Sequence, residues 1–290
     1  MSTFEITAED FRAIRDLIRA RFGIYYDDAK QFLLLSRLQT RLVKRGLDGY
    51  RSYVQFLQSN PQREAEWLEL ASVLSNNETY FFRERAQLRS LVGDILTELQ
   101  AHSPRLRLWS AACSSGEEPY SLAMTLLESG RIAESMISLK ATDISQRVLD
   151  LCQKGFYRAL SFRATEPAMI QKYFSPMGDG FLLSEKIRKM VSFSTLNLMD
   201  ENAIAAQGPL DAIFCRNVLI YFDKPTQKRV VEAFAKALRP GGYLFLGHAE
   251  SLFHLTDVFE PIVQPETIVY RVRAKATAGV RATATAGVRA

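Results

Sequence analysis

A short segment in the first half of the chain combines two neighbouring acids with small residues that a ligand can approach closely. It has the sequence LWSAACSSGEEPYS, residues 108–121, and it follows an apolar run that predicts a strand and leads into a predicted helix. In a doubly wound parallel sheet, ligands bind at the carboxyl ends of the strands, so this segment is a candidate binding loop. Gly116 is its only glycine, and the glycine-rich pattern of dinucleotide-binding loops is absent.

The two acids of this loop, Glu117 and Glu118, indicate the charge of the ligand. Carboxylates near a helix N-terminus are stabilised by the helix dipole, but they would repel a pyrophosphate held there. A cationic ligand is therefore favoured over NAD or ATP, and S-adenosylmethionine, which carries a sulfonium and an ammonium group, fits this charge pattern. The simpler alternative, that both acids only cap a helix, stays open on the loop alone.

Asp143 is a second candidate ligand-binding acid. It follows the predicted strand 137–141 and lies 27 residues after Gly116. An acid at this place typically binds the ribose hydroxyls of a nucleoside ligand. The alternative is that Asp143 is an N-cap for the next helix, a role for which Ser145 competes.

The elements that must position these residues alternate between strands and helices after about residue 87. Strands are predicted at 106–111, 137–141, 191–195, 210–215, 242–247 and 267–273, and a helix from about 225 to 238. This alternation predicts an α/β fold with a mostly parallel sheet and helices on both faces. The stretch 156–190 is less regular, and Gly178 and Gly180 suggest a small antiparallel insertion there.

Residues 1 to about 75 predict helices only. Thr7 is the expected N-cap of the first helix, which ends at Gly23, while Gly46 ends the second and Asn60-Pro61 ends the third. A fourth amphipathic stretch follows and completes a small helical module.

The net charge of +5 does not describe the body of the protein. Residues 271–290 contain five of the 37 Lys and Arg residues and no acid, which leaves 32 basic and 32 acidic side chains in the first 270 residues. A globally basic nucleic-acid binder is therefore excluded. The last residues, 274–290, repeat a Gly/Ala/Thr-rich octad that cannot bury a core, and we expect them to be disordered.

Cysteine spacing and hydropathy narrow the class of protein further. The three cysteines are far apart, and no histidine lies near one at metal-ligand spacing, so we expect no metal site. The N-terminus lacks the apolar segment of a signal peptide, and no uncharged apolar run approaches the length of a membrane span. We therefore expect a cytoplasmic protein without membrane insertion.

Taken together, the motifs resemble those of one family, the chemotaxis receptor methyltransferases of the CheR type. The matching stretches are NNETYFFRE at 76–84, LWSAACSSGEEPYSLAM at 108–124, ATD at 141–143, FSTLNL at 193–198, FCRNVLIYFD at 214–223 and GHAES at 247–251. They occur in the order of the family and extend to about residue 273.

The resemblance implies a fold and a domain organisation. It implies an all-helical N-terminal domain (1–75), a linker that contributes to the cofactor site (76–90), and a Rossmann-like S-adenosylmethionine-dependent methyltransferase domain (91–273). A small β-subdomain would be inserted at about 156–190. The repetitive tail has no counterpart in the family.

The resemblance also implies an activity. The protein would be a monomer that transfers a methyl group from S-adenosylmethionine to glutamate side chains on the cytoplasmic helices of chemoreceptors. The stretch SPMGDGFLLSEKI, 175–187, is shorter than in members that bind a peptide at the receptor C-terminus, so we expect no such tether. The alternatives are an RNA or small-molecule methyltransferase on the same fold and a non-catalytic S-adenosylmethionine-binding regulator.

Site residues are carried over by motif. The cofactor contacts implied by the resemblance are Asn77, Thr79, Arg83, Glu117, Asp143, Asn197, Leu198, Arg216 and Asn217. Arg83 and Tyr221 match residues placed near the reacting methyl group and are the candidate catalytic residues. Their simpler alternatives are an ion pair of Arg83 with Glu84 and a packed aromatic ring at Tyr221.

A cluster of one charge sign suggests how the substrate would be held. Residues 30–51 contain six basic residues and one acid, and Arg37, Arg41 and Arg45 have the i, i+4, i+8 spacing of one helical face. Such a basic ridge, together with Lys44, suits docking on a glutamate-rich helical bundle. The alternative is an ordinary solvated helix face.

Overall fold

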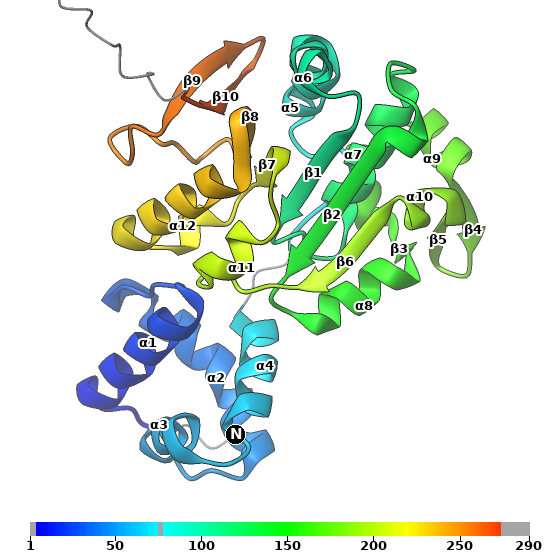
Figure 1. The fold of residues 1–290 in the computed structure, drawn as a ribbon. Coiled ribbons are helices and arrows are strands. Elements are labelled where there is room, and N and C mark those ends of the chain that lie inside the picture. Colours follow the sequence, from blue (N-terminus) through cyan, green and yellow to red (C-terminus); the bar gives the residue numbers. More distant parts are fainter. Residues whose placement is uncertain (1–3, 75–77, 274–290) are drawn as a thin grey trace, which may run out of the picture.

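The computed structural model describes residues 4–74 and 78–273, which form an N-terminal helical domain and a larger α/β domain (Figure 1). Two expectations fall outside the described residues: the cofactor contact of Asn77 and the disorder of 274–290. Among the described residues, no helix has both the length and the apolar character needed to span a membrane.

The N-terminal domain is a bundle of four helices. They are α1 (Ala8–Phe22), α2 (Gln31–Arg45), α3 (Tyr50–Ser59) and α4 (Arg63–Leu74), with a short 3₁₀ turn, η1 (Asp28–Lys30), before α2. The predicted boundaries are confirmed: the Thr7 hydroxyl accepts a hydrogen bond from the Asp10 N–H, and Gly23 and Gly46 end their helices in the left-handed conformation. Buried side chains from all four helices make one core, which includes Ile14, Leu38, Tyr53 and Leu70.

The α/β domain is built on a seven-stranded sheet with the order β6-β2-β1-β7-β8-β10-β9. The strands are β1 (Leu106–Ala111), β2 (Ile137–Asp143), β6 (Val191–Thr195), β7 (Leu210–Cys215), β8 (Leu238–Leu246), β9 (Phe259–Gln264) and β10 (Thr267–Val272). The first five strands of this order are parallel, and β10 runs antiparallel to both β8 and β9. The predicted mostly parallel sheet is thus confirmed.

One strand of this sheet was not predicted. β9 contains Pro261 and lies at the sheet edge, beside β10 only. Proline cannot donate to the ladder and is tolerated at an edge, where one side of the strand has no neighbour. The edge position explains why the local sequence does not look like a strand.

Helices cover both faces of the sheet. They include α5 (Arg85–Ser90), which continues through a π turn into α6 (Leu96–His102), and also α7 (Glu117–Glu128), α8 (Gln146–Lys154), α11 (Glu201–Ala205) and α12 (Lys224–Ala237). Alternate residues of β1 enter different cores: Leu108 packs with α7, whereas Trp109 packs with α12. β1 lies between β2 and β7, so the order of the strands reverses there and leaves a crevice at their carboxyl ends.

The predicted antiparallel insertion is a three-stranded sheet with the order β3-β5-β4. It consists of β3 (Phe156–Tyr157), β4 (Phe174–Met177) and β5 (Gly180–Leu183), with the 3₁₀ turn η4 (Ala159–Phe162) and the helices α9 (Pro167–Tyr173) and α10 (Glu185–Lys189). Phe81, which follows the N-terminal domain, stacks on Phe162 of the insertion and donates its N–H to the Ser161 carbonyl at 2.9 Å. The insertion therefore fixes the segment that joins the two domains.

Candidate active site

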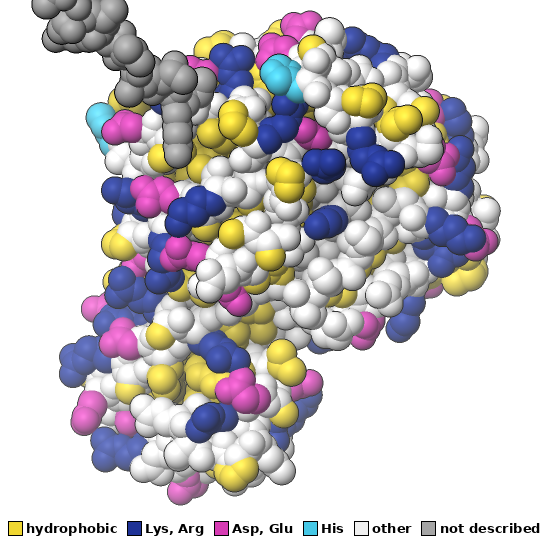
Figure 2. Space-filling model, in the orientation of Figure 1, with side chains coloured by type: hydrophobic (Ala, Val, Ile, Leu, Met, Phe, Trp, Pro, Cys, Tyr) yellow, Lys and Arg dark blue, Asp and Glu magenta, His cyan; other side chains and the backbone are white. Residues whose placement is uncertain are grey.

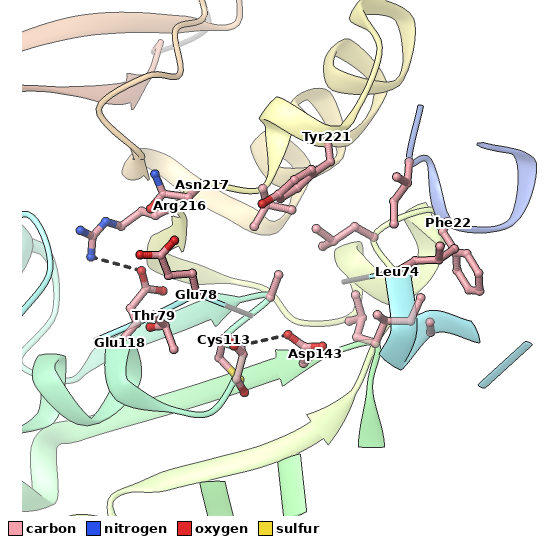
Figure 3. A pocket seen from close by; sticks show the side chains of 18 of the residues that line it. Phe22, Leu74, Glu78, Thr79, Cys113, Glu118, Asp143, Arg216, Asn217 and Tyr221 are labelled. Carbon is pink, nitrogen blue, oxygen red and sulfur yellow. Dashed lines mark hydrogen bonds and ion pairs between the residues drawn. The ribbon is translucent and has the colours of Figure 1, made fainter. Parts of the chain in front are cut away.

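The carboxyl ends of the central strands and the N-terminal domain enclose one cleft of about 1130 Å³, part of which opens to solvent (Figure 3). Its wall includes Phe22 at the end of α1, Leu74 at the end of α4, and Asp143 at the end of β2. The cleft lies at the place where ligands bind in doubly wound sheets. Figure 2 shows the two domains as separate lobes, with hydrophobic side chains visible where they join.

Most of the expected site residues meet at this cleft. Those that line it are Thr79, Arg83, Asp143, Asn197, Leu198, Arg216, Asn217 and Tyr221. They come from four stretches that are far apart in the sequence. Three of these stretches lie at or after the carboxyl ends of β2, β6 and β7, which meet at one edge of the parallel sheet, and the fourth is the segment between α4 and α5.

Glu117 is an exception, and its expected cofactor contact is not supported. Its buried carboxylate accepts hydrogen bonds from the hydroxyls of Ser115 at 2.7 Å and Ser161 at 2.9 Å, and it is not part of the cleft wall. Glu118 lines the cleft instead. The two residues begin α7, where successive side chains point about 100° apart, so only one of them faces the cleft. The sequence GEEP does not tell which one.

Glu118 is held by a buried arginine. It accepts hydrogen bonds from the Ser110 hydroxyl at 2.6 Å and from Nη1 of Arg216 at 3.2 Å (Figure 3). Burial raises the pKa of the Glu118 carboxyl, although the charge of Arg216 opposes that rise. Arg216 also pairs with Glu84 at 3.3 Å, while its Nε is buried without a hydrogen-bond partner among the described residues.

Asp143 has two structural bonds and still lines the cleft. Its Oδ2 accepts from the Ser114 N–H at 2.9 Å, and its Oδ1 accepts from the Ser145 N–H at 3.0 Å. Burial raises the pKa of this carboxyl. Asp143 thereby fixes the loop after β1 and the turn that precedes α8. The N-cap of α8 is Ser145, so the alternative that Asp143 caps this helix is wrong.

Arg83 is not paired with Glu84, which turns to Arg216 instead. Nη1 of Arg83 donates to the Glu78 carbonyl at 3.0 Å, and its guanidinium lies 5.6 Å from the centroid of the Tyr80 ring. These contacts hold the guanidinium at the cleft wall and leave its other donors available to a ligand.

Tyr221 connects the cleft to the N-terminal domain. Its ring lines the cleft (Figure 3), and its carbonyl accepts a hydrogen bond from the Tyr25 N–H at 2.8 Å. The next residue, Phe222, forms an isolated β-bridge with Ile24. The backbone on both sides of this junction is therefore fixed, with the Tyr221 side chain on the cleft wall.

Asn197 makes a similar connection. Its Nδ2 donates to the Arg21 carbonyl at 2.8 Å, and its Oδ1 accepts from the Met199 N–H at 3.0 Å. The side chain thus joins the loop after β6 to the end of α1, and this loop places Leu198 on the cleft wall.

Glu250 is a residue for which the sequence suggested no role, although its motif, GHAES, was noted. Its carboxylate accepts from the backbone N–H groups of Asn217 at 2.9 Å, Val218 at 2.8 Å, Gly247 at 2.6 Å and Ile220 at 3.3 Å. Asn217 has a φ of 61°, which few residues other than glycine adopt. Glu250 therefore holds the loop that runs from Asn217 to Tyr221 in an uncommon conformation.

The expected basic ridge on α2 is wrong as a solvent-exposed surface. Arg41 is only 4% exposed, and it donates to Glu66 of α4 through Nε at 2.9 Å and through Nη2 at 2.8 Å. Arg45 donates to the same carboxylate at 2.5 Å, and Arg37 donates to the Tyr26 hydroxyl and the Leu74 carbonyl. The i, i+4 face borders the apolar stripe of α2 and packs toward α4, which supplies the buried acid.

Lys44 alone among the four docking candidates is exposed. On the face shown in Figure 2, the Lys and Arg side chains of the N-terminal domain are interspersed with Asp and Glu. The alternative of an ordinary solvated face fits Lys44, and structural ion pairs account for the arginines.

The cleft suits S-adenosylmethionine chemically. Glu118 and Asp143 provide negative charge, the unpartnered Nε of Arg216 can receive a carboxylate, and Leu196, Leu198 and Ile144 provide an apolar surface. Within residues 4–74 and 78–273, no cluster of three or more His, Cys, Asp or Glu side chains has a geometry that could hold a metal ion.

Comparison with known proteins agrees with this geometry. The family model "CheR methyltransferase, SAM binding domain" matches residues 77–268, and "CheR methyltransferase, all-alpha domain" matches residues 9–75. The chain is 38% identical to chemotaxis protein methyltransferase 2 of Vibrio cholerae over 266 residues, which cover 89% of this chain and 91% of the relative. It is 39% identical to the chemotaxis protein methyltransferase of Escherichia coli over 253 residues, 86% of each chain.

Proposed function

Because the chain belongs to the CheR methyltransferase family, we propose that it methylates glutamate side chains on the cytoplasmic domains of chemoreceptors. Its family establishes it as an S-adenosylmethionine-dependent methyltransferase of chemotaxis. The observation that carries the finer assignment is the placement of Arg83 and Tyr221 on the wall of the same cleft as the acids Glu118 and Asp143.

The residues that would hold the cofactor divide its polar groups among them. Asp143 would accept hydrogen bonds from the ribose hydroxyls of the cofactor. Glu118 would pair with the ammonium group of its methionine part, and the free Nε of Arg216 would bind the carboxylate of the same part. The bound cofactor supplies an electrophilic methyl group on sulfur. Leu198 and its apolar neighbours would cover the adenine.

The acceptor requires no general base. A glutamate side chain has an ordinary pKa near 4.3, so it is ionised at neutral pH and already nucleophilic. No histidine is part of the described cleft wall, which fits a reaction that needs no proton abstraction. Orientation and exclusion of water then become the main contributions of the protein, and orientation supplies about 7–11 kcal/mol of barrier reduction in favourable cases.

Arg83 and Tyr221 would provide this orientation. The guanidinium of Arg83 can bind the acceptor carboxylate through two donors, and the Tyr221 hydroxyl can donate a hydrogen bond at the reacting centre. Tyr221 is fixed through its carbonyl by Tyr25, so the N-terminal domain takes part in placing it. This domain also contributes the apolar side chains of Phe22, Ile24, Ala71 and Leu74 to the cleft wall.

The proposal extends to the state of the protein and to its receptor contacts. We place the enzyme in the cytoplasm as a monomer that does not bind nucleic acid. The hairpin between β4 and β5 has only Gly178 and Asp179 at its turn, and so short a hairpin supports a mode of action without a C-terminal receptor tether.

Methyl transfer to purified receptor cytoplasmic domains tests the proposal. We expect tritium from labelled S-adenosylmethionine to appear on receptor domains with and without their C-terminal residues, and to be lost when the acceptor glutamates are replaced by alanine. Total RNA and a small-molecule extract serve as competing substrates. Labelling of RNA, or cofactor binding without any transfer, would contradict the assignment, and a requirement for the C-terminal residues would contradict tether independence.

Asp143→Asn tests the cofactor site separately. The neutral amide is a weaker acceptor for ribose hydroxyls, so the Kd for S-adenosylmethionine in calorimetry should rise by about ten-fold, the loss expected for a hydrogen bond to a charged group. Wild-type affinity in this variant would remove Asp143 from the site.

A further inference from the structure

In addition to Arg83 and Arg216, which line the cleft, an arginine of the insertion contacts two residues of the cleft wall. Arg163 follows η4, and its Cζ lies 3.8 Å from the centroid of the Tyr80 ring. Its Nη2 also donates to Oε1 of Glu78 at 3.0 Å. Because Glu78 and Tyr80 both line the cleft, Arg163 lies at the rim of the proposed active site.

Tyr80 thus contacts two arginines. Arg163 lies close to its ring, and Arg83 lies 5.6 Å from the ring centroid. Contact with an aromatic face restricts the guanidinium without using its hydrogen-bond donors. Two oriented positive groups therefore occupy the rim of a cleft whose interior contains the acids Glu118 and Asp143.

The carboxylate that now pairs with Arg163 is easily replaced. The side chain of Glu78 is 70% exposed and that of Arg163 is 36% exposed. Ion pairs exposed to this degree contribute little to stability because water solvates both partners. An incoming carboxylate from a substrate can therefore take the place of Glu78 at small cost, in contrast to the buried pair of Arg41 with Glu66.

We propose that Arg163 is a specificity-determining residue that binds an acidic side chain of the substrate next to the acceptor glutamate. Arg83 remains for the acceptor carboxylate itself. The substrate class is then a segment with at least two carboxylates close together, as on one face of an acidic helix. This inference rests on the proposed methylation of receptor glutamates and adds a second point of recognition to it.

Steady-state methylation of a receptor cytoplasmic domain by four variants tests the inference. Arg163→Gln should raise the KM for the receptor by about five-fold, which corresponds to one partly exposed charge pair, and should leave kcat and the Kd for S-adenosylmethionine unchanged. Arg158→Gln is the matched control, since Arg158 lies in the same insertion and pairs with the exposed Asp179 at 2.8 Å. It should behave as the wild type.

Glu78→Gln separates recognition from a purely structural role, because the two roles predict opposite signs. If Glu78 competes with the substrate for Arg163, its neutralisation should lower the KM for the receptor by about two-fold. If Arg163 only anchors the linker through Glu78, both variants should lose activity together, and that result would overturn the inference. Equal KM values for Arg163→Gln and Arg158→Gln would overturn it as well.

The wild-type enzyme in the same assay distinguishes the two proposals. A lack of methyl transfer to the receptor would overturn the proposed function, and the role of Arg163 with it. An active wild type whose KM does not respond to Arg163→Gln overturns the inference alone. Melting temperatures of all variants confirm folding, and Arg163→Lys, which retains the charge, should restore part of the affinity.

Discussion

Arg41 of α2 and Glu66 of α4 form a buried ion pair with two hydrogen bonds, from Nε to Oε1 at 2.9 Å and from Nη2 to Oε2 at 2.8 Å. Tyr53 donates its hydroxyl to the same carboxylate at 2.7 Å, so three helices meet at Glu66. α4 ends at Leu74, on the cleft wall. The pair therefore sets the position of a wall of the active site, and its arginine is unavailable for docking.

Arg41→Gln should destabilise the N-terminal domain, whereas Lys44→Gln should not. Removing one partner of a buried pair leaves the other charge uncompensated and costs about 3–5 kcal/mol. Lys44 is exposed, and its loss should change the free energy of unfolding by less than about 0.5 kcal/mol. Urea unfolding measures both values. Similar effects of the two variants would contradict the buried-pair interpretation.

The pH dependence of stability should reveal Glu66. Burial opposes its ionisation, but hydrogen bonds from Arg41, Tyr53 and Arg45 outweigh burial and hold its pKa below the ordinary range of a glutamate. Since the unfolded chain binds the proton more readily, the stabilisation is present above about pH 4.5 and is lost as pH falls through the lower pKa of the folded state.

Unfolding of wild type and Glu66→Gln between pH 7 and pH 3.5 checks this sign. The difference in free energy of unfolding between the two proteins should narrow on acidification. Glu9→Gln, at an exposed position, serves as the control and should differ from the wild type by a small and constant amount. If the difference in free energy of unfolding between the wild type and Glu66→Gln does not change with pH, the lowered pKa of Glu66 is contradicted.

Replacing each of the two acids at the start of α7 should affect cofactor binding differently. Glu118→Gln removes negative charge from the cleft and should weaken S-adenosylmethionine binding by about ten-fold. Glu117→Gln should leave the Kd within about two-fold, because its carboxylate faces Ser115 and Ser161. Calorimetry measures the Kd for S-adenosylmethionine of both variants. A higher Kd for Glu117→Gln alone would reverse the assignment.

Glu250→Gln should impair catalysis through the loop that carries Tyr221. The carboxylate of Glu250 has two acceptor oxygens for four backbone N–H groups, whereas the amide of glutamine has only one. Backbone donors that are left unsatisfied cost about 1–3 kcal/mol. We expect kcat to fall by about ten-fold as the loop shifts. Glu232→Gln on α12, where Glu232 pairs with Lys228 in an exposed i, i+4 arrangement, is the control. A lower melting temperature with unchanged kcat would limit Glu250 to a structural role.

Local signals predicted most of the elements. The strands at 106–111, 191–195 and 210–215 match the structure to the residue, since short apolar runs between polar loops have few other solutions in an α/β chain. The helix ends at Gly23 and Gly46 were equally clear, because glycine is the usual residue at the positive φ that ends a helix. Both glycines adopt a positive φ in the structure. β9 was missed because its pairing partner, and not its own sequence, makes it a strand.

The sequence by itself determined the alternation of elements, the helical N-terminal module and the family motifs, because these depend on spacing within one segment. Only the tertiary structure decided where each side chain points. Helical spacing places Arg41 next to an apolar stripe. It does not show that Glu66, 25 residues away in the sequence, lies opposite Arg41 where α2 packs against α4. Likewise Glu117 and Glu118 are adjacent residues of the same type. Only the tertiary structure shows that Glu117 bonds to Ser161 of the insertion, whereas Glu118 lines the cleft.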